Sequence, residues 1–169
     1  MKPDDLEQQV RDCYRRLTLR LMEQNCTITT MESATGGMVA SLLCDTEGTS
    51  AIFPGAFVTY SNEAKLRCGV PAQVIEQHSV YSRPTAAAMA QACRSFYDTH
   101  IGVGVTGTLG NTDQANPESS VPGELYFAFS FRAGDTVTHF TCLPPQKSRH
   151  QWKLAAADVV GSALWHHLF

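Results

Sequence analysis

The 169-residue sequence has no long apolar run and little excess of charge of either sign. Charged residues make up 17% of the chain, the formal net charge is −3, and no run of lysine or arginine occurs. A nucleic-acid-binding surface needs a basic patch and a transmembrane helix needs at least about 18 apolar residues, so we expect neither nucleic acid nor a membrane as a partner. The 43% of hydrophobic residues favours a single globular domain over residues 1–169.

The cysteines and histidines form no recognisable ligand or disulfide pattern. Six cysteines are scattered without a C-x-x-C pair, and six histidines show neither H-x-x-x-H nor H-E-x-x-H spacing. Scattered thiols are typical of a reducing cytosol, and the charged N-terminus has no apolar core of a signal peptide. The sequence therefore predicts a cytoplasmic protein without a metal site.

Helical and strand patterns alternate along the chain. Apolar spacing, caps and turn residues predict helices over 4–24, 36–44, 61–69, 71–77, 82–99 and from about 147 to the end. Strands are expected over 26–31, 55–60 and 101–107, and an antiparallel hairpin over 124–132 and 136–143. This order predicts an α/β fold, a single three-layer α/β/α domain with a mixed sheet that ends in the hairpin.

The stretch "MESATGG", residues 31–37, lies between a predicted strand and a predicted helix. One interpretation is structural: Ser33 or Thr35 caps the helix and the glycines ease the turn. The other is chemical, because Ser33 would stand at the carboxyl end of a strand. The backbone N–H groups of Thr35, Gly36 and Gly37 would then face the same space and could stabilise an anion.

The stretch "YSNEAK" follows the next predicted strand, with Ser61 as the helix cap. Lys65 would lie in the first turns of that helix, where the helix dipole and partial burial both lower the pKa of its ammonium group. A lysine of lowered pKa can act as general base for a serine hydroxyl, and Tyr60 could relay or orient the proton. The simpler alternative is a solvated lysine beside a half-buried tyrosine.

A third loop, "GVTGTLG", follows a strand of small residues that lets other groups approach its backbone. Thr106, Gly107 and Gly110 could lie against a phosphate or a ribose, or could simply form a turn. G-x-G-x-x-G is absent from this loop, and G-x-x-x-x-G-K-[ST] and G-x-S-x-G are absent from the whole chain. The sequence therefore does not predict the usual dinucleotide, P-loop or α/β-hydrolase sites.

Taken together, "MESATGG", "YSNEAKLRCGVP" and "GVTGTLG" closely resemble the C-terminal amidohydrolase domain of the CinA (competence/damage-inducible) family. The resemblance runs from about residue 5 to the end and includes the stretch "VYSRPTAAAMA". It implies a three-layer α/β domain that needs no metal or organic cofactor. It also implies hydrolysis of the carboxamide of nicotinamide mononucleotide, giving nicotinate mononucleotide and ammonia.

The resemblance assigns the nucleophile to Ser33 and the base to Lys65, with help from Tyr60. Amides of the 35–37 turn would hold either the oxyanion or the phosphate, and the sequence leaves both open. We expect the substrate to be contacted by Thr35, Gly36, Gly37, Asn62, Thr106, Gly107 and Arg149. The likeness implies a small nucleotide as ligand and leaves a homo-oligomer open.

The sequence departs from the family pattern at several positions, all of which except Ala34 lie near the expected substrate contacts. Ala34 replaces the usual cysteine, the glycine-rich "GIAGP-GG" stretch becomes the longer "GTLGNTDQANPESSVPG", and Glu124 lies in "GEL" where the family has "GTV". In "KSR", only Arg149 matches the family's "GDR". Two alternatives therefore stay open: a diverged member that binds a nucleotide-like ligand without turnover, and an amidase for another small amide.

Overall fold

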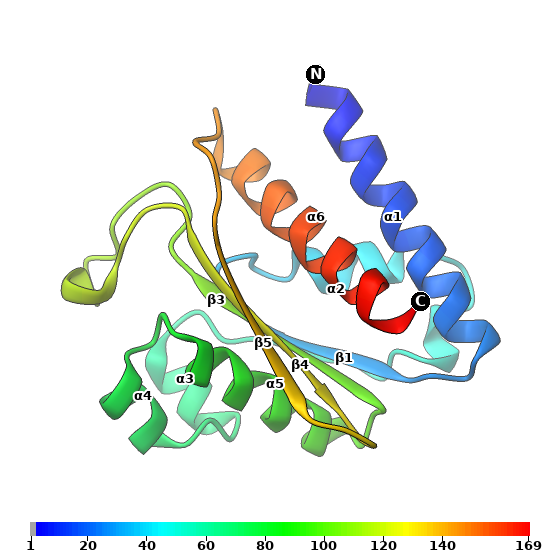
Figure 1. Cartoon of the computed structure of the whole chain (residues 1–169), viewed down its shortest axis with the longest axis horizontal. Coiled ribbons are helices and arrows are strands. Elements are labelled where there is room, and N and C mark those ends of the chain that lie inside the picture. The colour runs from blue at the N-terminus through cyan, green and yellow to red at the C-terminus, as the bar shows by residue number, and fades with distance from the viewer. Residues whose placement is uncertain (1–2) are drawn as a thin grey trace.

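A computed structural model describes residues 3–169 of the chain (Figure 1). The helices are α1 (Pro3–Glu23), α2 (Met38–Cys44), α3 (Asn62–Arg67), α4 (Ala72–His78), α5 (Arg83–Tyr97) and α6 (Arg149–Leu168). The strands are β1 (Ile28–Glu32), β2 (Ala56–Val58), β3 (Ile101–Gly107), β4 (Glu124–Phe131) and β5 (Thr136–Cys142). Short 3-10 turns occur at Thr49–Ala51 and Pro117–Ser119. The predicted elements are confirmed, with ends that shift by at most two residues.

In the described residues the strands form one five-stranded sheet in the order β2-β1-β3-β4-β5. The strand β1 is parallel to both β2 and β3, whereas β4 is antiparallel to β3 and β5. The sheet is therefore mixed, as predicted, and its hairpin forms one edge. Because β1 to β3 run in the same direction, their carboxyl ends meet at one end of the sheet, where ligands of α/β proteins gather.

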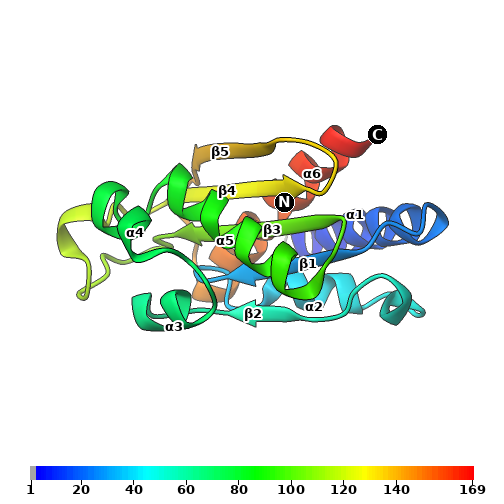
Figure 2. The same ribbon diagram turned by 90° about the horizontal axis from the view of Figure 1, so that it is seen from below.

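Helices cover both faces of the sheet, which confirms the expected three layers (Figures 1 and 2). On one face lie α1, α2 and α6, with a core built from the apolar sides of α1 and α6. Tyr14 of α1 is buried there and donates a hydrogen bond to the carbonyl oxygen of Ala157 on α6, at 2.8 Å. The other face is covered by α3, α4 and α5. No described helix is long and apolar enough to cross a bilayer.

The small residues of β3 have a packing role. A Cβ atom at Gly102 would lie 2.1 Å from the carbonyl oxygen of Ala90, and one at Gly104 would lie 2.1 Å from that of Ala86. Both carbonyls belong to α5, so the group that approaches this strand closely is a helix backbone. The glycines in "IGVGVTG" thereby set how tightly α5 packs on the sheet.

Candidate active site

Ser33 directly follows β1 at the carboxyl end of the sheet. Its backbone N–H donates to the carbonyl oxygen of Val105 on β3 at 2.9 Å, which continues the parallel pairing by one residue. On the other side, the N–H of Thr59 donates to the carbonyl oxygen of Glu32 at 2.8 Å. Neighbouring strands therefore fix the backbone on both sides of Ser33, whose side chain is 6% exposed.

The helix after Ser33 is capped by Glu32, not by Ser33 or Thr35. The N-cap residue of α2 is Gly37, which forms no side-chain cap. Glu32 is fully buried, and its carboxylate accepts hydrogen bonds from the N–H groups of Val39 (3.0 Å) and Ala40 (2.8 Å) at the start of α2. The structural interpretation of "MESATGG" was therefore wrong about the capping residue, because the preceding acid reaches the helix amides.

Glu32 also accepts hydrogen bonds from two buried hydroxyls, those of Thr30 (2.9 Å) and Thr35 (2.6 Å). Four donors thus surround one buried carboxylate, which is the condition for holding a charge out of water. The side chain of Thr35 is committed to this cluster, and the residue as a whole is 0% exposed. Sequence reasoning missed Glu32, because it stands six positions before the first residue of α2 and reaches the helix amides through a turn.

Among residues 3–169, two of the three predicted amides in the turn between β1 and α2 have no hydrogen-bond acceptor. Gly36 and Gly37 adopt left-handed conformations with φ of 59° and 90°, which favour glycine. The N–H of Gly36 donates to the carbonyl oxygen of Ser33 at 3.0 Å, so its expected role toward an anion is not supported. Within the described chain, the N–H groups of Thr35 and Gly37 have no recorded acceptor.

Lys65 meets Ser33 from the neighbouring helix α3. Ser61 caps this helix, as predicted, by accepting a hydrogen bond from the N–H of Ala64 at 3.0 Å. The Nζ atom of Lys65 lies 3.3 Å from Oγ of Ser33 and donates to the carbonyl oxygen of Thr59 at 2.8 Å. Lys65 is 1% exposed, so the surface-lysine alternative was wrong.

Burial changes the chemistry of Lys65. Desolvation lowers the pKa of its ammonium group to about 8, although the nearby carboxylate of Asp113 acts in the opposite direction. At neutral pH roughly a tenth of the molecules then carry a neutral amine, which can accept a proton. The direction of this pKa shift agrees with the expectation from the sequence.

The hydroxyl of Tyr60 is hydrogen-bonded to Arg149. The side chain of Tyr60 is 66% exposed, and its hydroxyl accepts a hydrogen bond from Nη2 of Arg149 at 3.0 Å. Nη1 of Arg149 donates to the carbonyl oxygen of Leu109. Within residues 3–169, no recorded hydrogen bond joins the Tyr60 hydroxyl to Ser33 or Lys65. The structure therefore brings Tyr60 together with Arg149 rather than with the serine–lysine pair.

The loop over residues 108–123 is organised by Asp113. Its carboxylate accepts hydrogen bonds from the Tyr81 hydroxyl (2.6 Å) and from the Asn116 amide (2.7 Å). The Asn116 side chain in turn accepts one from Nδ2 of Asn62 at 3.1 Å, so the predicted ligand residue Asn62 holds the loop against α3. Sequence reasoning missed Asp113 and Tyr81, because 32 residues separate the partners and no local pattern links them.

Thr106 and Gly107 form internal contacts. The hydroxyl of Thr106 is fully buried and donates to the carbonyl oxygen of Val80 at 3.0 Å. A Cβ atom at Gly107 would lie 2.3 Å from the carbonyl oxygen of Glu124, so glycine is required there by the close approach of β4. Both residues lie at the carboxyl end of β3, near the candidate site, but their observed contacts are with backbone carbonyls of the protein itself.

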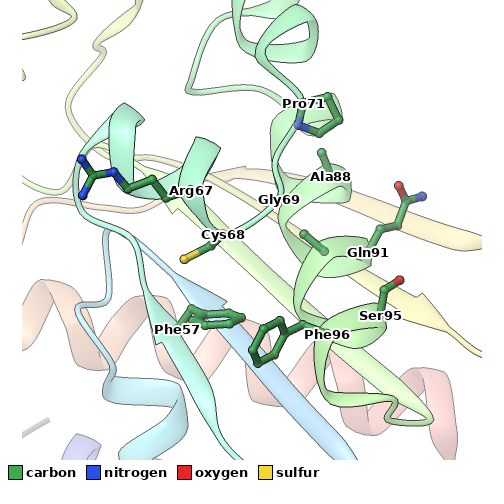
Figure 3. Close-up of a pocket in the computed structure, with 10 residues that line it drawn as sticks. Phe57, Arg67, Cys68, Gly69, Pro71, Ala88, Gln91, Ser95 and Phe96 are labelled. Carbon is green, nitrogen blue, oxygen red and sulfur yellow. The ribbon is translucent and has the colours of Figure 1, made fainter.

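A separate pocket of about 510 Å³ opens between the end of α3 and α5 (Figure 3). Phe57 and Phe96 pack edge-to-face there with ring centroids 4.9 Å apart, and the backbone of Gly69 contributes to the lining. Neither Ser33 nor Lys65 lines this pocket. It is therefore distinct from the serine–lysine pair.

The fold and site together define an α/β protein with a buried serine–lysine pair at the carboxyl end of its parallel strands. The model of the CinA C-terminal domain family matches residues 11–164. The chain therefore belongs to the CinA C-terminal domain family.

Named relatives differ in how much of their length this chain covers. The nicotinamide-nucleotide amidohydrolase PncC of Escherichia coli K12 is 37% identical over 123 residues, which are 72% of this chain and 73% of the relative. A putative competence-damage inducible protein of Limosilactobacillus fermentum is 34% identical over 132 residues. That match covers 78% of this chain but 31% of the relative, so the chain spans about a third of such proteins.

Solved structures share the fold over nearly the whole chain. A CinA superfamily protein from Escherichia coli superposes with a TM-score of 0.83 at 27% identity, covering 94% of this chain and 90% of that one. A competence or damage-inducible protein from Enterobacter asburiae gives 0.86 at 25% identity, covering 95% and 98%.

Proposed function

We propose that the chain hydrolyses the carboxamide of nicotinamide mononucleotide to nicotinate mononucleotide and ammonia. The observation that carries the proposal is the buried pair of Lys65 Nζ and Ser33 Oγ, 3.3 Å apart. Family membership and the name of the Escherichia coli relative support the substrate. A hydroxyl within reach of an amine of lowered pKa is the arrangement that nucleophilic acyl transfer needs.

The reaction proceeds in two balanced halves. The neutral amine of Lys65 accepts the hydroxyl proton while Oγ of Ser33 attacks the amide carbon, and the protonated lysine then gives its proton to the departing ammonia. This leaves an ester on Ser33. Water attacks the ester, Lys65 takes one proton from that water, and Ser33 leaves with a proton returned by Lys65. The net change adds one water and releases one ammonia.

Within the described residues, the Gly37 amide has no acceptor and is partly exposed, whereas the Thr35 amide belongs to a fully buried residue. Gly37 is therefore the donor better placed for an anion beside Ser33, where it would serve either the oxyanion of the tetrahedral intermediate or the substrate phosphate. Losing one oxyanion donor typically raises the activation barrier of the reaction by about 3–4 kcal/mol. The geometry of this turn is therefore expected to matter for the rate as much as the general base does. Arg149 and Tyr60, which contact each other, are assigned to substrate binding at the mouth of the site.

The 108–123 loop favours a second candidate, a member that binds a nucleotide-like ligand without turnover. Asn62 and Asn116 are bonded to each other rather than free to meet a ligand. In addition, Glu124 at the start of β4 would repel a phosphate that came near. An amidase for another small amide would keep the same chemistry and the same leaving ammonia, with a different acyl group on Ser33.

The deciding experiment measures ammonia release from nicotinamide mononucleotide by the native chain, Ser33→Ala and Lys65→Ala. We expect turnover that both substitutions abolish, and mass spectrometry should trap an acyl adduct on Ser33. A silent native chain that the compound nevertheless stabilises against heat would favour the binding protein. Absence of both turnover and stabilisation would rule out this ligand.

A further inference from the structure

Two histidines from distant parts of the sequence meet at the edge of the sheet. His139 lies on the edge strand β5, and His167 lies in the last turn of α6. Their Nε2 atoms are 3.3 Å apart. His139 is half-buried and His167 is exposed, so the space between the two nitrogens can be reached from solvent.

Aromatic rings of β4 hold both imidazoles in place. The ring of His139 stacks on that of Phe127 with centroids 4.7 Å apart and planes only 10° from parallel. The ring of His167 stands edge-on to Phe129 at 5.8 Å and to Phe131 at 6.3 Å. Because these rings restrict the imidazole planes, the two Nε2 atoms are held at this separation before any ligand arrives.

The spacing of the two nitrogens suits a metal ion. With Zn–N bonds of about 2.0–2.1 Å and tetrahedral angles, two ligating nitrogens lie about 3.3 Å apart. We propose that His139 and His167 form a two-histidine site for a divalent transition metal such as Zn²⁺. The described residues provide no cluster of three or more His, Cys, Asp or Glu that could hold a metal, so water would complete the coordination.

The local electrostatics leave the His139 imidazole able to bind. Burial, the neighbouring His167 and the guanidinium of Arg83 all lower the pKa of His139, which favours the neutral ring that a metal requires. The negative end of the α6 dipole lies beside His167 and attracts a cation. Arg83 opposes this attraction, so we expect modest rather than tight affinity.

A metal bound to both histidines would link the edge strand β5 to the end of α6. Arg149 begins the same helix and His167 nearly ends it, about 27 Å apart at 1.5 Å per residue. The metal site is therefore remote from the mouth of the candidate active site. Its expected effect is on stability, and the inference does not depend on the proposed deamidase activity.

The test compares melting temperatures in Zn²⁺ and in a chelator. The background carries Cys44→Ser and Cys142→Ser, because these exposed thiols could bind the metal themselves. At a Zn²⁺ concentration 100 times the dissociation constant, we expect a rise of about 5–10 °C. The rise should vanish in His139→Gln and in His167→Gln and persist in His166→Ala, the matched control on the same helix turn.

The difference between Zn²⁺ and chelator within each variant removes any effect of the substitution on folding itself. As a second measurement, ring nitrogen NMR should show Zn²⁺ shifting Nε2 of His139 and His167 but not His166. A melting temperature unchanged by Zn²⁺, or a rise that survives both His→Gln substitutions, would overturn the proposal. The pair would then be a hydrogen bond between imidazoles only.

Discussion

The Nζ atom of Lys65 lies 3.3 Å from Oγ of Ser33, although 32 residues separate them in the sequence. Two strand ends create this contact: Ser33 follows β1, and Lys65 is on the helix that follows β2. Parallel pairing of β1 with β2 brings both ends to the same edge of the sheet. The contact is therefore a consequence of topology, and several measurable properties depend on it.

The first prediction concerns pH. Because Lys65 must be neutral to accept the serine proton, kcat/KM should rise about tenfold per pH unit below its pKa and level off above about 8. Assays from pH 7 to 10 avoid the ionisation of the substrate phosphate at about pH 6. Lys65→Arg should remove activity over the whole range, since a guanidinium stays protonated. A native profile flat from pH 7 to 9 would exclude Lys65 as the base.

The second prediction is that the buried Lys65, which the reaction requires, lowers the free energy of unfolding of the native state. A folded-state pKa of about 8 against 10.5 means that the charged lysine destabilises the native state by up to about 3 kcal/mol below pH 8. As pH rises from about 8 to 10.5 the unfolded chain binds more protons than the native one, so native stability increases.

Lys65→Met should therefore abolish turnover and raise the free energy of unfolding at pH 7 by about 1–3 kcal/mol. The lower end of this range allows for the lost hydrogen bond to Thr59. Urea unfolding at pH 7 and pH 10 measures the difference in the free energy of unfolding between the variant and the native chain. If the difference comes from the charge on Lys65, it should be smaller at pH 10 than at pH 7. A less stable variant at pH 7 would contradict the argument.

Much of the scaffold could be predicted from the sequence, because its signals are local. Period-3.6 apolar spacing, serine caps at Ser61 and Ser82, and short β-branched runs specify elements within a few residues. The sequence left the burial of Lys65 open, because its place in the first turns of a capped helix suits a surface lysine as well as a buried one. The serine and lysine meet because parallel strands share an edge, which is a rule of topology rather than of sequence spacing.

The contacts that could not be predicted join distant segments. Nothing local indicates that Tyr81 reaches Asp113, or that Tyr60 faces Arg149 across 89 positions. Likewise, glycines in β3 indicated a close approach but not its partner, which is α5. Capping of α2 by Glu32 was assigned to the wrong residue because the acid precedes the helix by six positions and reaches it through a turn.

The third prediction concerns Glu32. Replacing its carboxylate by an amide in Glu32→Gln puts an NH₂ group against hydroxyl and amide donors. The free energy of unfolding should fall by about 2–4 kcal/mol, as measured by urea denaturation. Turnover should fall too, because Ser33 is the next residue. Thr30→Val removes one of the four donors and should cost only about 1 kcal/mol. If Glu32→Gln and Thr30→Val lowered the free energy of unfolding equally, the idea that the carboxylate holds this cluster together would be contradicted.

The fourth prediction separates substrate binding from proton transfer at Tyr60. The hydroxyl is bonded to Arg149, so Tyr60→Phe should raise KM severalfold while kcat stays within about threefold of the native value. Arg149→Lys should act in the same direction, since it loses the two-sided contact with Tyr60 and Leu109. A kcat lowered by about 100-fold or more at unchanged KM would instead place Tyr60 in the proton transfer.

The last prediction uses Asp113 to test the pKa of Lys65 from a distance. The carboxylate of Asp113 raises the pKa of Lys65, so Asp113→Asn should move the midpoint of the pH–rate profile to lower pH. The same change weakens the bonds to Tyr81 and Asn116, so the loop should loosen and KM should rise. Tyr81→Phe is the matched control: it removes one of those bonds but keeps the charge. A midpoint that moves in Asp113→Asn and stays in Tyr81→Phe isolates the electrostatic effect, whereas equal midpoints in both would show that Asp113 acts on the loop alone.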